Sequence, residues 1–203
     1  MSKIGLVVNP IAGMGGKVGL KGTDGPEIVE KARERGAEQV APERTVKALR
    51  EFRSFGRDTQ ILTCSDEMGE EEAVEAGLEP EVVLNISSDE TTSEDTKAAA
   101  EKFLDSEVDI ILFAGGDGTA EDIVEIADGK VPMLGIPTGV KMHSAVFANT
   151  PEIAGKLLAR YLAGRLPLRE AEVMDVDEEA FRENELETDL KGYGKTPYDP
   201  KWV

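Results

Sequence analysis

Short aliphatic runs alternate along this chain with longer stretches in which apolar residues recur every three or four positions. The runs are too short for helices and are rich in Val, Ile and Leu, which is typical of buried strands. We expect strands at residues 3–8, 58–64, 81–86, 109–114, 130–136 and 169–177. The amphipathic stretches predict helices at residues 26–35, 42–52, 70–76, 96–104, 120–127 and 151–163. This alternation favours an α/β fold with an open, mostly parallel, doubly wound sheet, which binds ligands at the carboxyl ends of its strands.

The most apolar run, residues 109–114, ends in a glycine-rich turn composed of Gly115, Gly116, Asp117, Gly118 and Thr119. We expect Thr119 to cap the helix that follows. Glycines adopt positive φ and let a ligand approach the backbone, and the amides of a helix N-terminus attract anions. The chemistry of the protein is therefore predicted to lie at this turn.

Asp117 places a carboxylate in that turn. A carboxylate beside a phosphate-binding turn can hold Mg²⁺, hydrogen-bond a sugar hydroxyl or accept a proton from an attacking hydroxyl. The alternative is a plain strand-to-helix turn in which Asp117 accepts hydrogen bonds from backbone amides. Both interpretations are open at the level of the sequence.

A second glycine-rich loop spans residues 9–25, after the first predicted strand, and holds six glycines in seventeen positions. This composition excludes a regular helix. The loop is no Walker A motif, since Lys17 is followed by Val18 rather than Ser or Thr, and Val18 also stands where the dinucleotide fingerprint needs its third glycine. Long glycine-rich loops in compact domains are uncommon unless functional, and the alternative is a flexible surface loop.

Several polar segments are expected to have structural roles. Thr92 and Asp95 have capping-box spacing, so the polar side chains of residues 87–95 are predicted to cap a helix, although this loop could also line a nucleotide site. The acidic helix at 70–76 is predicted to be a solvated face. Thr150 is expected to cap the helix at 151–163, and Asp177 to cap a short acidic helix that runs to residue 182.

The chain has 41 acidic and 23 basic residues and a net charge of −18. This balance argues against sequence-independent binding to nucleic acid or to an anionic membrane, which needs a basic face. A nucleotide must then be met by local groups such as Lys17, Lys21, Lys141, backbone amides or Mg²⁺. Cys64 is the single cysteine, which excludes an intrachain disulfide and a cysteine-rich zinc site, and it is expected to be a small buried hydrophobe. The sequence shows no signal peptide and no apolar stretch of membrane-spanning length, so the cytoplasm is the expected location.

The turn at 115–119, together with Asn9-Pro10-Ile11-Ala12-Gly13 after the first strand, resembles the ATP-NAD kinase family, within the wider group that includes diacylglycerol kinases. The longer segments at 9–16 and 135–143 are most similar to archaeal and bacterial ATP-NAD kinase-like proteins. The resemblance spans about residues 3–177 and implies the fold of the NAD kinase N-terminal domain.

The resemblance also implies transfer of a phosphoryl group from ATP or polyphosphate to a hydroxyl of NAD⁺, which gives NADP⁺, with Mg²⁺ or another divalent cation. Asp117 would be the general base, or the partner of the hydroxyl and of Mg²⁺, and Lys17 or Lys141 would offset the developing charge. A lone histidine is more often a surface or packing residue than a ligand contact, but His143 follows the third predicted loop. The residues implied in nucleotide binding are Asn9, Pro10, Gly13, Gly15, Gly16, Lys17, Gly115, Gly116, Gly118, Thr119, Pro137, Thr138, Gly139, Lys141 and His143.

We expect a nucleotide-binding α/β domain over residues 1–168 and the start of a truncated second domain, or a tail, over 169–203. Kinases of this family continue into a β-rich second domain, and residues 184–203 are too few and too polar to build one. Homo-oligomers are expected by analogy with those kinases. Two alternatives to an NAD kinase stay open: a kinase of another hydroxyl acceptor, such as a lipid or a polyol, and a non-catalytic nucleotide-binding or accessory protein.

Overall fold

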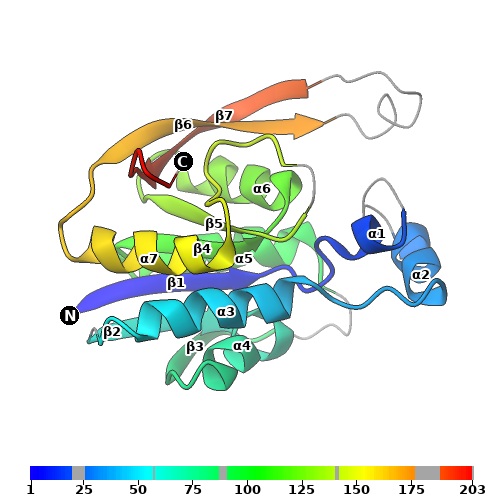
Figure 1. Ribbon diagram of the computed structural model, residues 1–203, viewed down its shortest axis with the longest axis horizontal. Helices are drawn as coiled ribbons and strands as arrows, with labels where there is room; N and C mark the ends of the chain where they lie inside the picture. The colour runs from blue at the N-terminus through cyan, green and yellow to red at the C-terminus, as the bar shows by residue number, and fades with distance from the viewer. Residues whose placement is uncertain (20–25, 57, 87–90, 140–141, 177–187, 203) are drawn as a thin grey trace.

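The computed structural model describes residues 1–19, 26–56, 58–86, 91–139, 142–176 and 188–202. Strands and helices alternate from β1 to β5, and an antiparallel pair of strands follows α7 (Figure 1). The elements are β1 (Ser2–Val8), α1 (Met14–Lys17), α2 (Pro26–Glu34), α3 (Ala41–Arg53), β2 (Thr59–Cys64), the 3-10 helix η1 (Asp66–Met68), α4 (Glu70–Glu75), β3 (Pro80–Leu84), α5 (Ser93–Asp105), β4 (Ile110–Gly115), α6 (Asp117–Ala127), β5 (Met133–Pro137), α7 (Pro151–Leu162), β6 (Leu168–Val176) and β7 (Thr188–Pro197).

Within these residues, five strands form a parallel sheet in the order β3-β2-β1-β4-β5. The chain runs outward from β1 through β2 to β3, and then returns to add β4 and β5 on the other side of β1. The direction of strand addition reverses between β1 and β4, and a reversal of this kind opens a crevice at the carboxyl ends of the strands. In Figure 1 the carboxyl end of β1 points to the right, toward α1. The predicted doubly wound α/β architecture is confirmed.

Helices cover both faces of the sheet because alternate residues of each strand point to opposite sides. On β4, Ile110 and Leu112 pack in one apolar cluster with α3 and α7. Ile111 and Phe113 pack in a second cluster with α5 and α6. All the residues of β4 are buried. The central strand therefore has no polar face, which explains why its sequence is an unbroken aliphatic run.

The hairpin of β6 and β7 lies over α6, on the β5 side of the sheet (Figure 1). The segment between β5 and α7 connects the hairpin to the sheet by main-chain hydrogen bonds. Ala145 donates its amide to the carbonyl oxygen of Glu172 in β6 at 2.8 Å, and Gly135 in β5 donates to that of Val146 at 2.9 Å. Val173 of β6 is buried in the same apolar cluster as α6. The hairpin thus shares a core layer with the main sheet.

The residues after β7 pack against α7. Asp199 is buried and pairs with Arg160, whose guanidinium carbon lies 4.9 Å from the ring centroid of Trp202. Trp202 in turn contacts the apolar cluster that α3 and α7 share. An ion pair and an aromatic contact together tie this segment to the helix layer.

The expectation that Thr119 caps the following helix is wrong. The helix α6 begins three residues earlier than expected, at Asp117, with Gly116 as its N-cap. Thr119 lies in the first turn and is buried. The physical reason is the bare backbone of Gly115, where an added Cβ would lie 2.4 Å from the Cβ of Thr119. The side chain of Thr119 fills the space beside Gly115, so Thr119 packs inside the first turn of α6 and does not stand before the helix.

The expectation that the acidic helix is only a solvated face is also wrong. In α4, Glu72 is 3% exposed and Ala73 is fully buried. A short helix that packs on α3 must turn one side inward, and position 72 falls on that side. Burial, with smaller contributions from the neighbouring charges of Glu71, Glu67 and Glu75, raises the pKa of Glu72 to about 7. The inward glutamate is therefore largely protonated below that pH.

Several smaller expectations from the sequence are confirmed, and a few features of the structure were not expected. The capping box of Thr92 and Asp95 and the Thr150 cap are confirmed. Cys64 is buried as expected, and burial raises the pKa of its thiol to about 12. The loop after β1 contains the one-turn helix α1, and the strand β7 was not expected. The predicted helix that Asp177 would cap lies outside the described residues. Among the helices described, none has both the length and the apolar character needed to cross a membrane.

Candidate functional site

The candidate site is built on the register of three neighbouring strands. Val8 of β1 pairs with Ala114 of β4, and Ala114 pairs with Ile136 of β5. The residues that follow these three are Asn9, Gly115 and Pro137. Parallel strands in register end at one edge of the sheet, so three of the residues singled out from the sequence stand side by side there.

Asn9 joins the ends of β1 and β4. Its amide N–H donates to the carbonyl oxygen of Ala114 at 2.9 Å, and its side-chain Nδ2 donates to Oγ1 of Thr119 at 3.2 Å. The Oδ1 atom of Asn9 is buried and has no hydrogen-bond partner among the described residues. Buried polar atoms are almost always paired in proteins, so this oxygen is available to a donor group of a ligand or a water molecule.

Thr138 ties the loop after β5 to the end of β4. Its buried hydroxyl donates to the carbonyl oxygen of Gly115 at 2.7 Å. Gly13 belongs to the loop after β1, has a φ of +81°, and lies so close that an added Cβ would stand 2.2 Å from the carbonyl oxygen of Thr138. The three glycine-containing loops therefore touch one another, and glycine is the residue that permits the contact.

Asp117 lies at the start of α6, and both its carboxylate oxygens accept hydrogen bonds from the loop after β5. The backbone amide of His143 donates to Oδ2 at 2.8 Å, and the amide of Ser144 donates to Oδ1 at 2.9 Å. A carboxylate has about four lone-pair sites, so two remain for a hydroxyl or a cation. Asp117 thus does what the structural alternative predicts, while its remaining acceptor sites leave the chemical role open.

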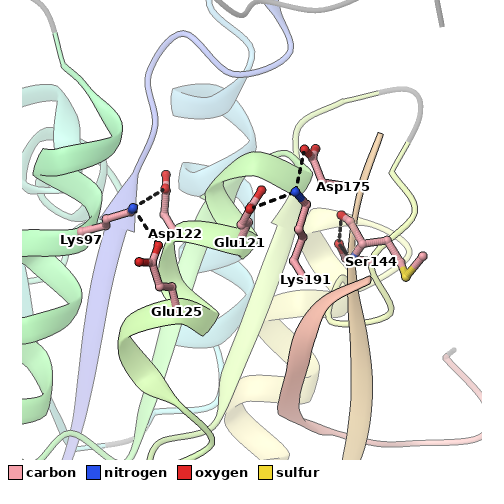
Figure 2. Close-up of polar contacts among 8 residues, drawn as sticks. Lys97, Glu121, Asp122, Glu125, Ser144, Asp175 and Lys191 are labelled. Atoms are coloured by element: carbon pink, nitrogen blue, oxygen red, sulfur yellow. Dashed lines mark hydrogen bonds and ion pairs between the residues drawn. The ribbon is translucent and has the colours of Figure 1, made fainter. Parts of the chain in front are cut away.

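Ser144, whose amide donates to Asp117, also bonds to the hairpin, and Figure 2 draws these hairpin contacts. Its hydroxyl donates to the carbonyl oxygen of Met174 in β6 and accepts from the amide of the same residue, both at 3.0 Å. The loop that holds Asp117 is therefore itself held by β6. A buried hydroxyl that donates and accepts at once fixes the position of the backbone on either side of it.

The helix α6 is held on both flanks by lysines (Figure 2). Lys97 of α5 lies 2.7 Å from Glu125 and 3.9 Å from Asp122. On the other flank, Lys191 of β7 lies 3.5 Å from Glu121 and bridges α6 to β6. These pairs link the helix whose first residue is Asp117 to α5 on one flank and to the hairpin on the other.

The pKa values of Asp122, Lys97 and Lys191 are raised in these contacts. Burial raises the pKa of Asp122 to about 6, and the charge of Lys97 opposes that effect. The hydrogen bond to Glu125 raises the pKa of Lys97, and the charge of Glu121 raises that of Lys191. Both lysines therefore stay charged throughout the physiological range.

The other residues singled out from the sequence differ in their exposure to solvent. In α1, Gly15 is buried and Gly16 exposed; Pro10 is buried, Gly139 is half-buried, and Gly118 and His143 are exposed. The side chain of Lys17, and Lys21 and Lys141 altogether, lie outside the described part of the chain. Pro137 and Thr138 are buried where β5 ends.

Arg44 is a residue at this edge that the sequence analysis missed. It belongs to α3, and its Nη1 donates to the carbonyl oxygen of Pro137 at 2.7 Å. In the sequence it is one arginine in an amphipathic helix, and no motif distinguishes it from Arg50 or Arg53. Only the fold shows that the helix begins at the carboxyl edge of the sheet.

A resident metal site formed by protein side chains alone is not seen in the described residues. No group of three or more His, Cys, Asp or Glu side chains there could hold an ion. Mg²⁺ usually binds through one or two carboxylates, waters and substrate phosphates rather than in an all-protein cage. Asp117 at the turn, with free acceptor sites on its carboxylate, fits a cation that arrives with a phosphate ligand.

One protein family matches most of this chain. The family model described as the ATP-NAD kinase N-terminal domain matches residues 4–166. No curated protein and no solved structure matches the chain significantly. The matched region runs from β1 through α7 and includes all three glycine-containing loops. The chain therefore belongs to the ATP-NAD kinase family and contains the N-terminal domain of that family.

Proposed function

We propose that this chain is a phosphotransferase that moves the terminal phosphoryl group of ATP, or of polyphosphate, to a hydroxyl of NAD⁺ and so produces NADP⁺. The observation on which the proposal rests is the carboxylate of Asp117, which accepts hydrogen bonds from two backbone amides at the edge where three glycine-containing loops touch. Phosphoryl transfer needs mainly positioning and electrostatic stabilisation, and such an edge supplies both.

Asp117 is assigned the role of orienting the acceptor hydroxyl and accepting its proton. The oxygen of the hydroxyl attacks the terminal phosphorus, the bond from that phosphorus to ADP, or to the shortened polyphosphate, breaks, and the proton passes to the carboxylate. The amides of His143 and Ser144 hold that carboxylate in one orientation, at 2.8 and 2.9 Å. A fixed carboxylate needs no rearrangement when the hydroxyl arrives, which lowers the barrier.

The glycine-containing loops are assigned to the phosphates. Gly13, Gly115 and Gly116 leave the backbone bare, so that amide groups can approach an anion closely. Lys17 or Lys141 is proposed to offset the charge that develops during transfer. Mg²⁺ would be held by Asp117 and by the phosphates themselves, and its contribution is to neutralise the phosphate oxygens.

The first test is NADP⁺ formation by the purified 203-residue protein with NAD⁺, Mg²⁺ and ATP, repeated with polyphosphate as the donor. Asp117→Asn should abolish turnover, because an amide cannot take up the proton. It should also cost about 1–3 kcal/mol of stability, because one of the two backbone amides loses its acceptor. Folding of the variant must therefore be checked by circular dichroism.

The matched control is Asp128→Asn, at the C-terminal end of the same helix. Asp128 is exposed and has a φ of +46°, a conformation that asparagine tolerates equally well. This variant should retain full activity. Equal turnover by Asp117→Asn and the wild type would rule out the proposed role, and turnover of a polyol or lipid in place of NAD⁺ would reassign the acceptor.

A non-catalytic nucleotide-binding protein is the second candidate. One observation favours it: the contacts of Asp117 to His143 and Ser144 already explain the carboxylate as a structural anchor. This candidate predicts that the protein binds ATP or NAD⁺ without forming product. Calorimetric binding together with the activity assay separates the two candidates.

A further inference from the structure

Arg44 stands at the edge of the sheet where the candidate site lies. It is half-buried in the first turns of α3, and its Nη1 donates to the carbonyl oxygen of Pro137 at 2.7 Å. Pro137 pairs with Gly115 in the sheet, and Thr138, the next residue, bonds to Gly115 through its hydroxyl. The guanidinium of Arg44 therefore binds the residue that precedes Thr138, and Thr138 is where the loops after β4 and β5 are in contact.

Two of the other three cations of α3 have acidic partners, and the third, Arg53, is exposed and donates to the carbonyl oxygen of Ala76. Lys47 lies 2.7 Å from Glu43, and Arg50 lies 3.1 Å from Glu75. Arg44, in contrast, has no ion pair with any residue in the described part of the chain. Charged groups are seldom removed from water unless they are paired, so a half-buried guanidinium with no carboxylate partner among the described residues is suited to bind an anion from outside the protein.

The hydrogen bond to Pro137 does not by itself account for a charge at this position. The loop after β5 is already held by the hydroxyl of Thr138 and by the close contact with Gly13. A carbonyl oxygen needs one neutral donor, whereas a guanidinium offers five N–H groups in a planar fork. The contact with Pro137 uses Nη1 and leaves the other nitrogens of the fork available.

We propose that Arg44 is a phosphate-binding residue, and that its bond to Pro137 sets the direction of the guanidinium. The planar fork matches the oxygens of a phosphate, which it can bind through two parallel hydrogen bonds. The ligand class is a polyphosphate anion, either the chain of the phosphoryl donor or the pyrophosphate of a dinucleotide. Assignment of the anion to the donor rests on the proposed function; the presence of a phosphate at Arg44 does not.

The test is calorimetric titration of the intact protein with inorganic tripolyphosphate, ATP and NAD⁺ in separate experiments. Arg44→Met should weaken tripolyphosphate binding about ten- to hundredfold, because a hydrogen bond to a charged group is lost. Arg44→Lys keeps the charge but not the fork, and should fall between the wild type and Arg44→Met. The matched control, Arg50→Met, makes the same chemical change in the same helix and should bind within about twofold of the wild type, since an exposed ion pair contributes little.

A purely structural role for Arg44 predicts a different result. Arg44→Met would then lower the melting temperature but leave the Kd for tripolyphosphate, and the dependence of that Kd on salt concentration, unchanged. A phosphate contact predicts a weaker salt dependence in Arg44→Met than in the wild type. An unchanged Kd in Arg44→Met, or a wild-type protein that binds none of the three ligands, overturns the inference.

The arms of the experiment also separate this inference from the proposed function. If the protein makes no NADP⁺ but binds tripolyphosphate through Arg44, the phosphate site stands and the proposed reaction fails. If the protein makes NADP⁺ and Arg44→Met has the same KM for the donor and the same Kd for tripolyphosphate, the reaction stands and the inference fails. A loss confined to the NAD⁺ titration would assign Arg44 to the dinucleotide and not to the donor.

Discussion

The carbonyl oxygen of Thr138 lies 2.2 Å from the position that a β-carbon at Gly13 would occupy. This contact joins the loop after β1 to the loop after β5 across the end of β4. Gly13 also has a φ of +81°, which residues with a side chain rarely adopt. Two separate requirements, a left-handed backbone and a close approach, therefore meet at one glycine.

Gly13→Ala should separate the two loops. The methyl group cannot share space with a backbone carbonyl, so the loop after β1 must move and the Asn9 contacts next to it must loosen. We expect the free energy of unfolding to fall by about 1–3 kcal/mol, from backbone strain and the clash together. We also expect weaker ATP binding. Urea unfolding and calorimetry measure the two effects.

Gly36→Ala, after α2, is the control for the strain alone. Gly36 has a φ of +76°, but nothing lies within 4 Å of an added Cβ. This substitution should cost about 1–2 kcal/mol of stability and leave ATP binding unchanged. If the two alanine variants bind ATP equally well and lose the same stability, the contact between the loops contributes to neither property.

The hydrogen bond from Asn9 to Thr119 gives a second prediction. Thr119→Val keeps the shape of the buried side chain but removes the hydroxyl that accepts from Nδ2 of Asn9. The stranded amide should cost about 1–3 kcal/mol in the free energy of unfolding. Thr119→Ser keeps the hydroxyl and should restore the hydrogen bond, at the price of one methyl group. Equal losses in the valine and serine variants would show that packing, and not the bond, matters at this position.

Much of the fold could be predicted from the sequence because the apolar composition of its central elements indicates that they are buried. A short apolar run such as residues 110–114, closed by two glycines, is typical of a strand with both faces covered, and the amphipathic stretches between such runs are typical of helices. The two glycine-rich turns marked the ends of β1 and β4 for a similar reason, since bare backbone is needed where loops meet. These inferences depend on local sequence, and local sequence was sufficient for them.

The features that the sequence could not predict depend on contacts between distant residues. The strand β7 is rich in polar residues and glycine, and it is held by its pairing with β6 rather than by its own apolar pattern. Arg44 gains its position from the direction of α3, and Thr119 is buried because Gly115 leaves room for it. The division of the chain into a nucleotide-binding domain over residues 1–168 and a further segment over 169–203 stays a prediction, as do the roles of the individual site residues.

The packing of α7 on α3 gives a third prediction. A Cβ added to Gly155 of α7 would lie 2.3 Å from the carbonyl oxygen of Ala48 and 3.0 Å from the Cβ of Glu51 in α3. Gly155→Ala should therefore push the helices apart and destabilise the protein by about 1–3 kcal/mol, although alanine is the better helix former. Gly118→Ala is the contrast, because nothing lies within 4 Å of an added Cβ in α6, and it should stabilise the protein by up to about 1 kcal/mol. A gain of stability in both variants would contradict the close helix packing.

Glu72 makes the stability of the protein depend on pH. The pKa of this buried glutamate is raised to about 7, from 4.5 for an unburied group. Its Oε2 has no hydrogen-bond partner among the described residues, so the folded state favours the neutral acid. Between these two pH values the unfolded chain has released the proton while the folded protein still holds it. The free energy of unfolding should therefore fall as pH rises through this window, and level off above about pH 7.

Glu72→Gln should remove this slope, because the amide resembles the protonated acid at every pH. At pH 8 the variant should be more stable than the wild type by about 1–3 kcal/mol, and at pH 4.5 the two should be nearly equal. Asp122, whose pKa is raised to about 6, adds a slope of the same sign at lower pH, so the comparison is sharpest above pH 6. Glu79→Gln, at an exposed position, is the control and should follow the wild-type curve. Urea unfolding from pH 4.5 to 8 measures all three proteins, and parallel curves for Glu72→Gln and the wild type would mean that the buried carboxyl does not titrate in this range.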